Sequence, residues 1–343
     1  MNYLIFSDNT KGLQYLIDEG YGESIDLCYI DPPYNTGRTF KINNNNDKTR
    51  TIGVTQDEPI AYTDKYDTLD EYLSFLSERI RLIHQLLSPQ GSFYLHCDNK
   101  HSHYIKILCD EIFTQDMFRA DITRVKGNPK NFLKRNYGNI KDNILFYTKT
   151  DDYIWNRPYV PFKEWELKKK YPKHDTFGDY CTVSLHAPGE VENGVTGKEW
   201  KGLLPPKGRH WCTNPSELTE WDNKGMIEWS GNGNPRRKMY AKDSKGKLMQ
   251  DVWVDYKDPP RPSYPTQKNS QLLNQIIRTS SREDSIVLDC FMGSGVTCIE
   301  SYKLGRSWIG IDNSKYSLQT FQREYGVLEE NLYNSKKYEF IEL

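Results

Sequence analysis

The chain has 343 residues and a formal net charge of −1, enough length for one large or two ordinary domains. A near-neutral chain is not a polycation, so any nucleic-acid surface must come from local clusters of positive charge. No apolar run is long enough to span a bilayer, and the first residues lack the regions of a signal peptide. The seven cysteines include no Cys-x-x-Cys pair, so we expect reduced thiols in a cytoplasmic protein.

Strands and helices alternate along the first part of the chain. In chain order, hydrophobic periodicity predicts strand 3–6, helix 11–17, strand 25–30, helix 69–87, strand 91–97, helix 103–113 and strand 143–147. Residues 38–61 are polar with almost no periodicity, and we expect a long functional loop there. The alternation indicates a parallel, doubly wound α/β sheet.

The strand predicted at 25–30 leads into the tetrapeptide Asp31-Pro32-Pro33-Tyr34. Prolines lock φ and donate no backbone hydrogen bond, so this stiff turn holds one carboxylate and one ring at a fixed spacing. A carboxylate and a carbonyl as acceptors, with a ring for stacking, suit a flat aromatic amine. For the tetrapeptide alone, an ordinary strand-ending turn with a capping Asp is an equally good interpretation.

Four polar residues near the end of strand 91–97 are of the types that bind metals. They are His96, Asp98, His101 and His103. Their spacing matches no common metal site, and a strand-to-helix turn accounts for them. We therefore predict no metal site.

Two parts of the chain carry positive charge suited to nucleic acid. Residues 124–141 contain no acidic residue and interleave cations with Asn and Tyr, as phosphate contacts require, although most charge runs are solvated faces. Residues 151–258 form an irregular segment with many Pro, Gly and Trp residues, which suits a substrate-reading element. The expected DNA contacts are Lys126, Lys130, Arg135, Arg209, Arg236, Arg237 and Lys238.

A regular pattern returns in the last part of the chain. It predicts helix 271–277, strand 285–290, glycine loop 291–295, helix 296–304 and strand 308–312. Gly293 and Gly295 let the backbone approach a ligand, and the helix N-terminus favours an anionic group. Asp312 lies where an acid hydrogen-bonds ribose hydroxyls. Cys298 replaces the third glycine of a dinucleotide fingerprint, so an adenosyl ligand with a carboxylate fits at least as well as a dinucleotide.

Together, the Asp31–Tyr34 motif and the later glycine loop resemble the S-adenosylmethionine-dependent DNA amino-methyltransferases of the beta class, in which the catalytic motif comes first. Segments 139–147 and 264–268 extend the resemblance over most of the chain. Segments 208–211 and 231–236 are similar to the modification (Mod) subunits of type III restriction systems.

Two positions depart from the family pattern. Val296 stands where the family usually has Thr, and Asn269 where it usually has Pro. Both are peripheral to the expected chemistry, so they leave the class intact.

The resemblance implies a Rossmann-like, doubly wound α/β fold with circularly permuted motif order. It divides the chain into a catalytic half at 1–150, an irregular inserted target-recognition region at 151–259, and a cofactor-binding half at 260–343.

The resemblance also implies roles for single residues. Asp31 accepts one hydrogen bond from the target amine, the carbonyl of Pro32 or Pro33 accepts the other, and Tyr34 stacks on the flipped base. The residues expected to contact the cofactor S-adenosylmethionine are Asp8, Thr266, Lys268, Asp289, Phe291, Gly293, Gly295 and Asp312.

The function implied is methylation of the N6 amine of adenine in double-stranded DNA, as part of a restriction-modification system. Cytosine N4 methylation stays open as an alternative, although Asp31 favours adenine. A non-catalytic DNA-binding subunit also stays open. From the glycine loop alone, a nicotinamide oxidoreductase is a further alternative. Carbon-5 cytosine methylation is excluded because the sequence has no Pro-Cys nucleophile. We expect a homodimer with no membrane contact, and a restriction subunit is a further candidate partner.

Overall fold

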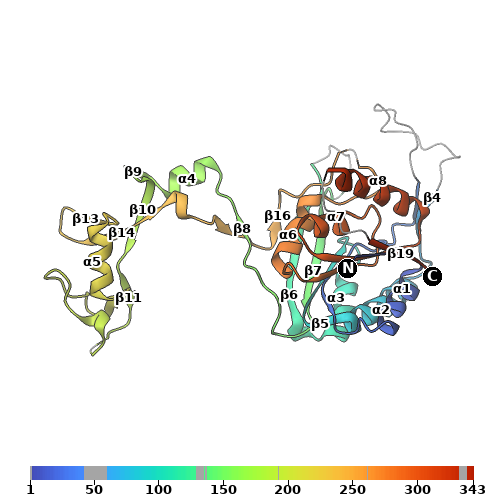
Figure 1. Ribbon diagram of the computed structural model, residues 1–343, viewed down its shortest axis with the longest axis horizontal. Coiled ribbons are helices and arrows are strands. Elements are labelled where there is room, and N and C mark those ends of the chain that lie inside the picture. The colour runs from blue at the N-terminus through green and yellow to red at the C-terminus, as the bar shows by residue number, and fades with distance from the viewer. Residues whose placement is uncertain are drawn as a thin grey trace. The chain divides into compact units, whose positions relative to one another are not determined.

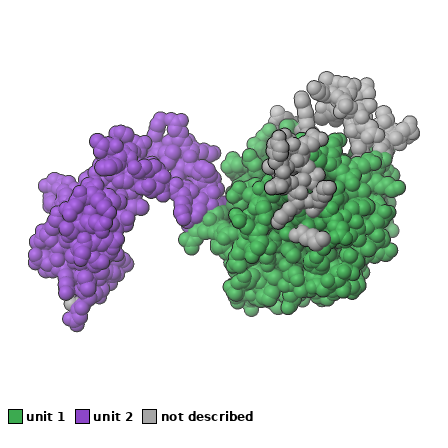
Figure 2. Space-filling view, viewed as in Figure 1, with its two compact units in different colours: residues 1–158, 250–343 green, residues 159–249 purple. Residues whose placement is uncertain are grey.

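The computed structural model describes residues 2–41, 60–128, 135, 137–191, 193–260, 262–331 and 338–343. The chain forms two compact units, coloured separately in Figure 2. Unit 1 consists of residues 1–158 and 250–343, and unit 2 of residues 159–249. Unit 1 therefore joins both ends of the chain, and unit 2 is inserted between them.

Unit 1 is built on a large sheet with helices on both faces (Figure 1). Its strands are β1 (Asn2–Phe6), β2 (Ile25–Ile30), β5 (Leu87–Cys97), β6 (Phe118–Val125), β7 (Lys141–Thr148), β16 (Val252–Trp253), β17 (Ile286–Asp289), β18 (Ser307–Asp312) and β19 (Tyr338–Glu342). Its helices are α1 (Asn9–Asp18), α2 (Leu69–Leu86), α3 (Ser102–Phe113), α6 (Ser270–Ser280), α7 (Val296–Lys303) and α8 (Lys315–Asn331).

The doubly wound α/β sheet predicted from the sequence is confirmed, with a correction to strand direction. The strand order is β16-β6-β7-β5-β2-β17-β18-β1-β19. Most neighbours run parallel, but β7 is antiparallel to both β5 and β6. Antiparallel neighbours need no helical crossover, and β6 connects to β7 without a helix among the described residues.

The adjacency of β2 and β17 brings together the two motifs that are far apart in the sequence. These strands pair in parallel, with Leu27 opposite Val287 and Cys28 opposite Leu288. The carboxyl ends of parallel strands lie at the same edge of a sheet. The turn after β2 and the glycine loop after β17 therefore meet at that edge.

Apolar side chains fill the space on both faces of the sheet. One core packs Leu13, Leu76 and Ile105 from helices α1, α2 and α3 against the strands. A second core, around Trp308 and Phe321, packs α7 and α8 against the other face. Burial on two faces explains why the central strands read as continuous apolar runs.

The loop predicted at 38–61 is partly wrong, because its two ends form a hairpin. Strand β3 (Arg38–Lys41) pairs antiparallel with β4 (Ile60–Asp64). The rings of Phe40 and Tyr62 stack across the pair, with 4.8 Å between centroids, and such cross-strand aromatic pairs stabilise hairpins. Residues 42–59 lie outside the described part of the chain.

Unit 2 has short elements and a small core of its own. The buried residues at its centre are Leu185, Trp200, Trp211, Leu218 and Ile227. Its elements are β8 (Tyr159–Val160), α4 (Glu164–Lys170), β9 (Lys173–Asp175), β10 (Gly178–Ser184), β11 (His186–Pro188), β12 (Arg209–Trp211), α5 (Pro215–Asn223), β13 (Ile227–Trp229), β14 (Pro235–Tyr240) and β15 (Lys247–Leu248). None of the helices described in either unit has the length and apolar character needed to cross a bilayer.

Candidate functional site

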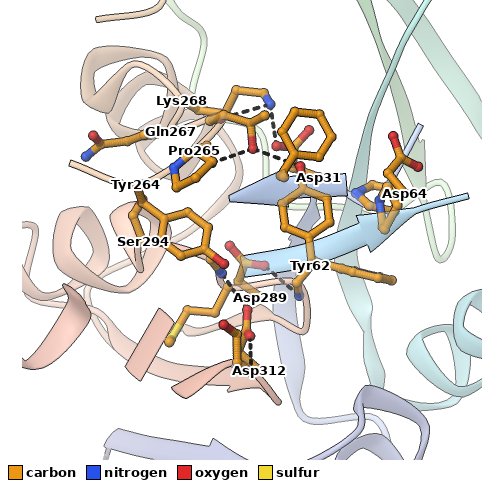
Figure 3. A pocket seen from close by; sticks show the side chains of 18 of the residues that line it. Asp31, Tyr62, Asp64, Tyr264, Pro265, Gln267, Lys268, Asp289, Ser294 and Asp312 are labelled. Atoms are coloured by element: carbon orange, nitrogen blue, oxygen red, sulfur yellow. Dashed lines mark hydrogen bonds and ion pairs between the residues drawn. The ribbon is translucent and has the colours of Figure 1, made fainter. Parts of the chain in front are cut away.

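A cavity of about 590 Å³ lies in unit 1, lined by both the turn after β2 and the loop after β17 (Figure 3). All four residues of the predicted catalytic turn line it. The predicted cofactor residues in its wall are Asp8, Thr266, Lys268, Asp289, Phe291, Gly293 and Asp312. Gly295 is not a lining residue, although its neighbours Ser294 and Val296 are. The structure thus brings the predicted catalytic and cofactor residues to one cavity.

The carboxylate of Asp31 has a partner on each oxygen. The hydroxyl of Tyr34 donates to Oδ1 at 2.5 Å, and the ammonium group of Lys268 forms an ion pair with Oδ2. Burial raises the pKa of Tyr34, and the neighbouring Asp31 raises it further, so Tyr34 is a neutral donor. The sequence predicted Lys268 as a cofactor contact, whereas the structure places its ammonium group on Asp31.

The two proline carbonyls of the turn differ in their surroundings. The Pro33 carbonyl accepts a hydrogen bond of 2.7 Å from the hydroxyl of Tyr72, a buried residue of α2. Among the described residues, no donor contacts the carbonyl of Pro32, which lines the cavity. Pro32 therefore offers the available carbonyl acceptor beside Asp31.

Asp312, at the end of β18, holds the glycine loop. Its carboxylate accepts hydrogen bonds of 2.8 Å from the backbone N–H groups of Gly293 and Ser314. Burial raises the pKa of Asp312 to about 6. Each carboxylate oxygen has a further lone pair, so Asp312 can still accept a hydrogen bond from a ligand in the cavity.

Asp289 is buried beneath the same loop. Its oxygens accept from the backbone N–H of Phe291 at 3.0 Å and from the hydroxyl of Thr297 at 2.5 Å. Burial raises the pKa of Asp289 to about 7, and the carboxylates of Asp31 and Asp312 add to the rise. Because Asp289 is only 3% exposed and both of its oxygens bind the chain itself, it shapes the loop from behind.

Asp8 lies at the start of α1, on the cavity wall. It caps the helix by accepting a hydrogen bond of 2.9 Å from the backbone N–H of Thr10. A guanidinium nitrogen of the buried Arg79 lies 3.4 Å from its other oxygen. Nothing in the sequence marked Arg79, because its spacing on α2 is that of an ordinary helix residue.

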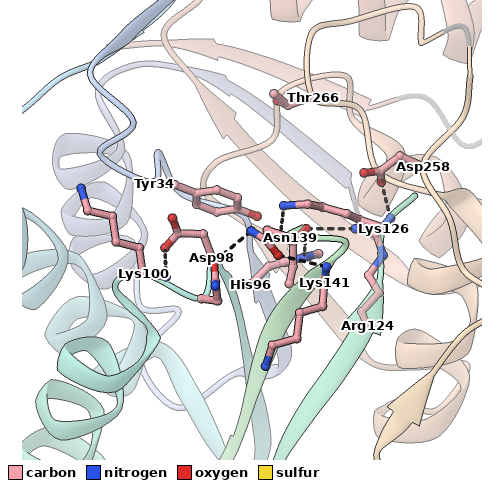
Figure 4. A network of polar contacts seen from close by, with 12 residues as sticks. Tyr34, His96, Asp98, Lys100, Arg124, Lys126, Asn139, Lys141, Asp258 and Thr266 are labelled. Atoms are coloured by element: carbon pink, nitrogen blue, oxygen red, sulfur yellow. Dashed lines mark hydrogen bonds and ion pairs between the residues drawn. The ribbon is translucent and has the colours of Figure 1, made fainter. Parts of the chain in front are cut away.

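A buried polar network lies beneath the Tyr34 ring (Figure 4). The hydroxyl of Tyr29 lies 2.8 Å from Nδ1 of His96, and Nε2 of His96 lies 3.4 Å from Asp142. Asp142 also pairs with Lys126 at 2.7 Å. Burial lowers the pKa of His96, which favours the neutral imidazole.

These contacts change the interpretation of two sequence features. His96, considered above as a metal ligand, is part of this network, and the described residues contain no group of three His, Cys, Asp or Glu side chains placed to hold a metal. Lys126, predicted to contact DNA, points its ammonium group at Asp142. Asp142 belongs to segment 139–147, and that resemblance was the only signal for it.

Two further residues of unit 1 were predicted to contact DNA. Arg135 is exposed, and Lys130 lies outside the described residues.

Three of the four predicted DNA contacts in unit 2 have partners inside that unit. Arg236 donates two hydrogen bonds of 3.0 Å to Thr182, and Lys238 forms an ion pair with Asp175 at 2.8 Å. The guanidinium group of Arg237 lies 3.8 Å from the ring centroid of Trp221.

Arg209 is the exception. It is exposed, and its side chain has no partner among the described residues.

Comparisons with known proteins identify the family of this chain. A DNA methylase family model (N6_N4_Mtase) matches residues 25–323. The chain is 40% identical over 332 residues to the type II methyltransferase M.EcaI of Enterobacter cloacae, which covers 95% of this chain and 70% of that protein. It is 25% identical over 343 residues to the type III restriction-modification enzyme StyLTI Mod subunit of Salmonella typhimurium, covering 86% of this chain and 49% of that subunit.

A solved structure, that of the M1.HpyAVI–SAM complex, shares the fold with a TM-score of 0.51 at 17% identity, covering 95% of this chain and 99% of that one. The family match spans most of the chain, from β2, which leads into the Asp31 turn, past the glycine loop and into α8. The chain therefore belongs to the N6/N4 DNA methylase family.

Proposed function

We propose that this chain transfers the methyl group of S-adenosylmethionine to the N6 amine of an adenine flipped out of duplex DNA. Family membership supports DNA methylation as the reaction. The observation that most supports an exocyclic amine as the acceptor is that Asp31 and Pro32, whose carbonyl has no donor among the described residues, line the same cavity. Two adjacent acceptors match the two hydrogens of an amine.

Asp31 and Pro32 act by position and charge. An aromatic amine is a poor nucleophile because its lone pair is delocalised into the ring. Asp31 and the Pro32 carbonyl draw the amine toward tetrahedral geometry and offset the positive charge that develops during attack. Tyr34 provides the stacking ring, and Tyr72 holds the turn by binding the Pro33 carbonyl.

The chemistry of the second wall suits the methyl donor. The carboxylate of Asp312 can accept hydrogen bonds from the ribose hydroxyls of the cofactor. The rings of Phe75 and Phe291, whose centroids are 6.1 Å apart, provide apolar surface for the adenine of the cofactor. When bound, S-adenosylmethionine supplies an electrophilic methyl group on a sulfonium. Lys268 offsets the charge of Asp31, a carboxylate with only 17% of its side chain exposed.

Cytosine N4 methylation is the alternative, since its amine presents the same two hydrogens to the same acceptors. Asp at position 31 favours adenine, because it follows the pattern of the adenine-specific enzymes that the sequence resembles. The intact Asp31–Tyr34 turn argues against a non-catalytic DNA-binding subunit.

We also propose a setting for the reaction. The named relatives include a type II methyltransferase and a type III Mod subunit, which supports a role in a restriction-modification system. We expect the enzyme to work in the cytoplasm as a homodimer, with unit 2 reading the recognition sequence and a restriction subunit as a candidate partner. Light scattering of the purified protein tests the homodimer.

Sequencing with detection of modified bases tests the proposed reaction. The chain is expressed in a bacterial host that lacks its own DNA methylases, and the host DNA is sequenced. We expect N6-methyladenine at one short recognition sequence. N4-methylcytosine in its place would select the alternative, and unmodified DNA would refute both.

The variant Asp31→Ala provides a matched control. It should leave the DNA unmodified, because one of the two amine acceptors is gone. Calorimetry should show that it still binds S-adenosylmethionine, since Asp31 faces the amine. An equal loss of cofactor binding and activity would contradict this division of roles.

A further inference from the structure

We propose that Asp64 is a positioning residue that fixes the catalytic turn for methyl transfer. The inference rests on the proposed function, because it concerns the same Asp31–Tyr34 turn. Asp64 ends strand β4 and is only 1% exposed. It lies beside the cavity in Figure 3. Buried carboxylates are rare unless their oxygens have strong partners.

The partners of Asp64 are the two residues that directly follow the catalytic turn. Its Oδ1 accepts a hydrogen bond of 2.6 Å from the backbone N–H of Asn35. Its Oδ2 accepts from the backbone N–H of Thr36 at 3.0 Å and from the Thr36 hydroxyl at 2.6 Å. The Asp64 carbonyl also accepts from the N–H of Gly37 at 2.9 Å. A single residue thus binds every backbone N–H from position 35 to 37.

The same hydrogen bonds hold the backbone at Asn35. Its φ of +54° lies in the left-handed region, which is unfavourable for most residues with a side chain and which Asn adopts more readily than the others. Such conformations persist when the surrounding contacts hold them. The carboxylate of Asp64 supplies two of those contacts, and the backbone N–H of Tyr66 donates to the Asn35 side chain at 3.2 Å.

The buried carboxylate of Asp64 in turn depends on the hydrogen-bond donors of the catalytic turn's next residues. Among the described residues, no Lys, Arg or His forms an ion pair with Asp64, so its charge is balanced by the donors of residues 35 and 36. Hydrogen bonds to an ionised acceptor are roughly twice as strong as neutral ones. A buried carboxylate without them would be strongly unfavourable. Asp64 and the left-handed turn therefore stabilise each other.

Strand β4 also touches the opposite side of the site. The hydroxyl of Tyr62 lies 3.2 Å from the hydroxyl of Thr266, two residues before the Lys268 that pairs with Asp31. Asp64 and Tyr62 thus link the β3–β4 hairpin to both parts of the chain that meet at the catalytic carboxylate. Asp64 itself is not expected to touch the amine, because it is only 1% exposed.

The decisive variant is Asp64→Asn, which keeps the shape and removes one acceptor. An asparagine has one side-chain oxygen, so the backbone N–H of either Asn35 or Thr36 must face an NH₂ group. A small displacement of reacting groups lowers rates by about 10²-fold, and we expect a fall in kcat of this order. The dissociation constant for S-adenosylmethionine should not change. Steady-state methylation with radiolabelled S-adenosylmethionine, on unmethylated plasmid DNA carrying the mapped site, measures kcat.

Variants of Thr36 keep the test valid if Asp64→Asn folds poorly. Thr36→Val removes one hydrogen bond to Asp64 without changing the size of the side chain, and it should lower kcat. Thr36→Ser keeps the hydroxyl, so its kcat should stay near that of the wild type. The double variant with Asp64→Asn should lose less than the sum of the single losses. Asp67→Asn is the matched control: Asp67 is exposed, lies three residues further on and should have wild-type kcat.

Two results would overturn the inference. One is wild-type kcat in Asp64→Asn; the other is a parallel loss of kcat and cofactor affinity in both Asp64→Asn and Thr36→Val, which would indicate general disruption. A wild-type enzyme that methylates no DNA would instead refute the proposed function, so the two failures are distinguishable.

Discussion

The carboxylate of Asp312 holds the glycine loop, and we propose that it also contacts the ribose of the cofactor. Burial raises its pKa to about 6, above the ordinary 3.8, so the free enzyme carries a proton there under mildly acidic conditions. Ribose hydroxyls donate to the ionised form, and a bound cofactor should therefore lower this pKa and release protons. We predict that affinity for S-adenosylmethionine increases as the pH rises from about 5 to about 7.

Calorimetry in buffers of different ionisation enthalpy checks this prediction, because proton release adds a buffer-dependent heat. The variant Asp312→Asn cannot ionise and should bind more weakly with less pH dependence. An affinity of the wild-type enzyme that is constant across this pH range would show that the ribose is held elsewhere.

Arg209 and Arg237 allow DNA contact and structural support to be separated within unit 2. Arg209 is exposed without a described partner, so Arg209→Ala should weaken DNA binding and lower the slope of its salt dependence by about one, leaving stability unchanged. Arg237 packs on Trp221, so Arg237→Ala should lower the melting temperature of the protein. Binding measured over a range of salt concentrations, with thermal unfolding, distinguishes them. An unchanged salt slope for Arg209→Ala would contradict its assignment.

At the scale of elements, the start of α7 depends on a glycine. Gly295 has a φ of +75°, and a Cβ there would lie 2.3 Å from the ring of Phe321. Gly295→Ala should therefore destabilise unit 1 by about 1–3 kcal/mol through overpacking, beyond the backbone strain. Urea unfolding measures the loss of free energy.

Gly20→Ala is the control for backbone strain. Gly20 has a similar φ of +86°, but a Cβ added there would have no atom within 4 Å outside the two neighbouring residues of the chain. Subtracting the loss of unfolding free energy in Gly20→Ala from the loss in Gly295→Ala gives the part caused by the clash with Phe321. Equal losses in the two variants would show that the Phe321 ring moves aside without penalty.

Elements with a clear apolar period were predictable from the sequence, and contacts between distant segments were not. The apolar run at 25–30 and the helical period at 69–87 correctly predicted β2 and α2. The β3–β4 hairpin was missed because its stabilising pair, Phe40 and Tyr62, is separated by a polar stretch. The ion pair between Lys268 and Asp31 also went unpredicted, since no local pattern links residues at opposite ends of the chain.

The molecule consists of one unit that contains the cavity and a second unit with a small core of its own. Replacing residues 159–249 by the corresponding unit of a relative with a different recognition sequence should transfer that specificity while methylation continues. The reason is that, under the proposed function, the unit 1 cavity must hold the methyl donor and one base, which leaves little surface for neighbouring base pairs. Sequencing of the modified host DNA checks the chimaera. An active chimaera that still modifies the original sequence would refute the role of unit 2.

The pairing of β2 with β17 has a consequence for protein synthesis. Cys28 leaves the ribosome before unit 2, and its register partner Leu288 leaves after the whole of unit 2. Contacts between residues so distant in sequence form slowly, and domains fold as units once their parts are available. A nascent chain therefore displays the Asp31 turn before the glycine loop, which is proposed to hold the methyl donor, has been synthesised. Methylation competence should arise in a single late step, so interrupted translation yields no partly active enzyme.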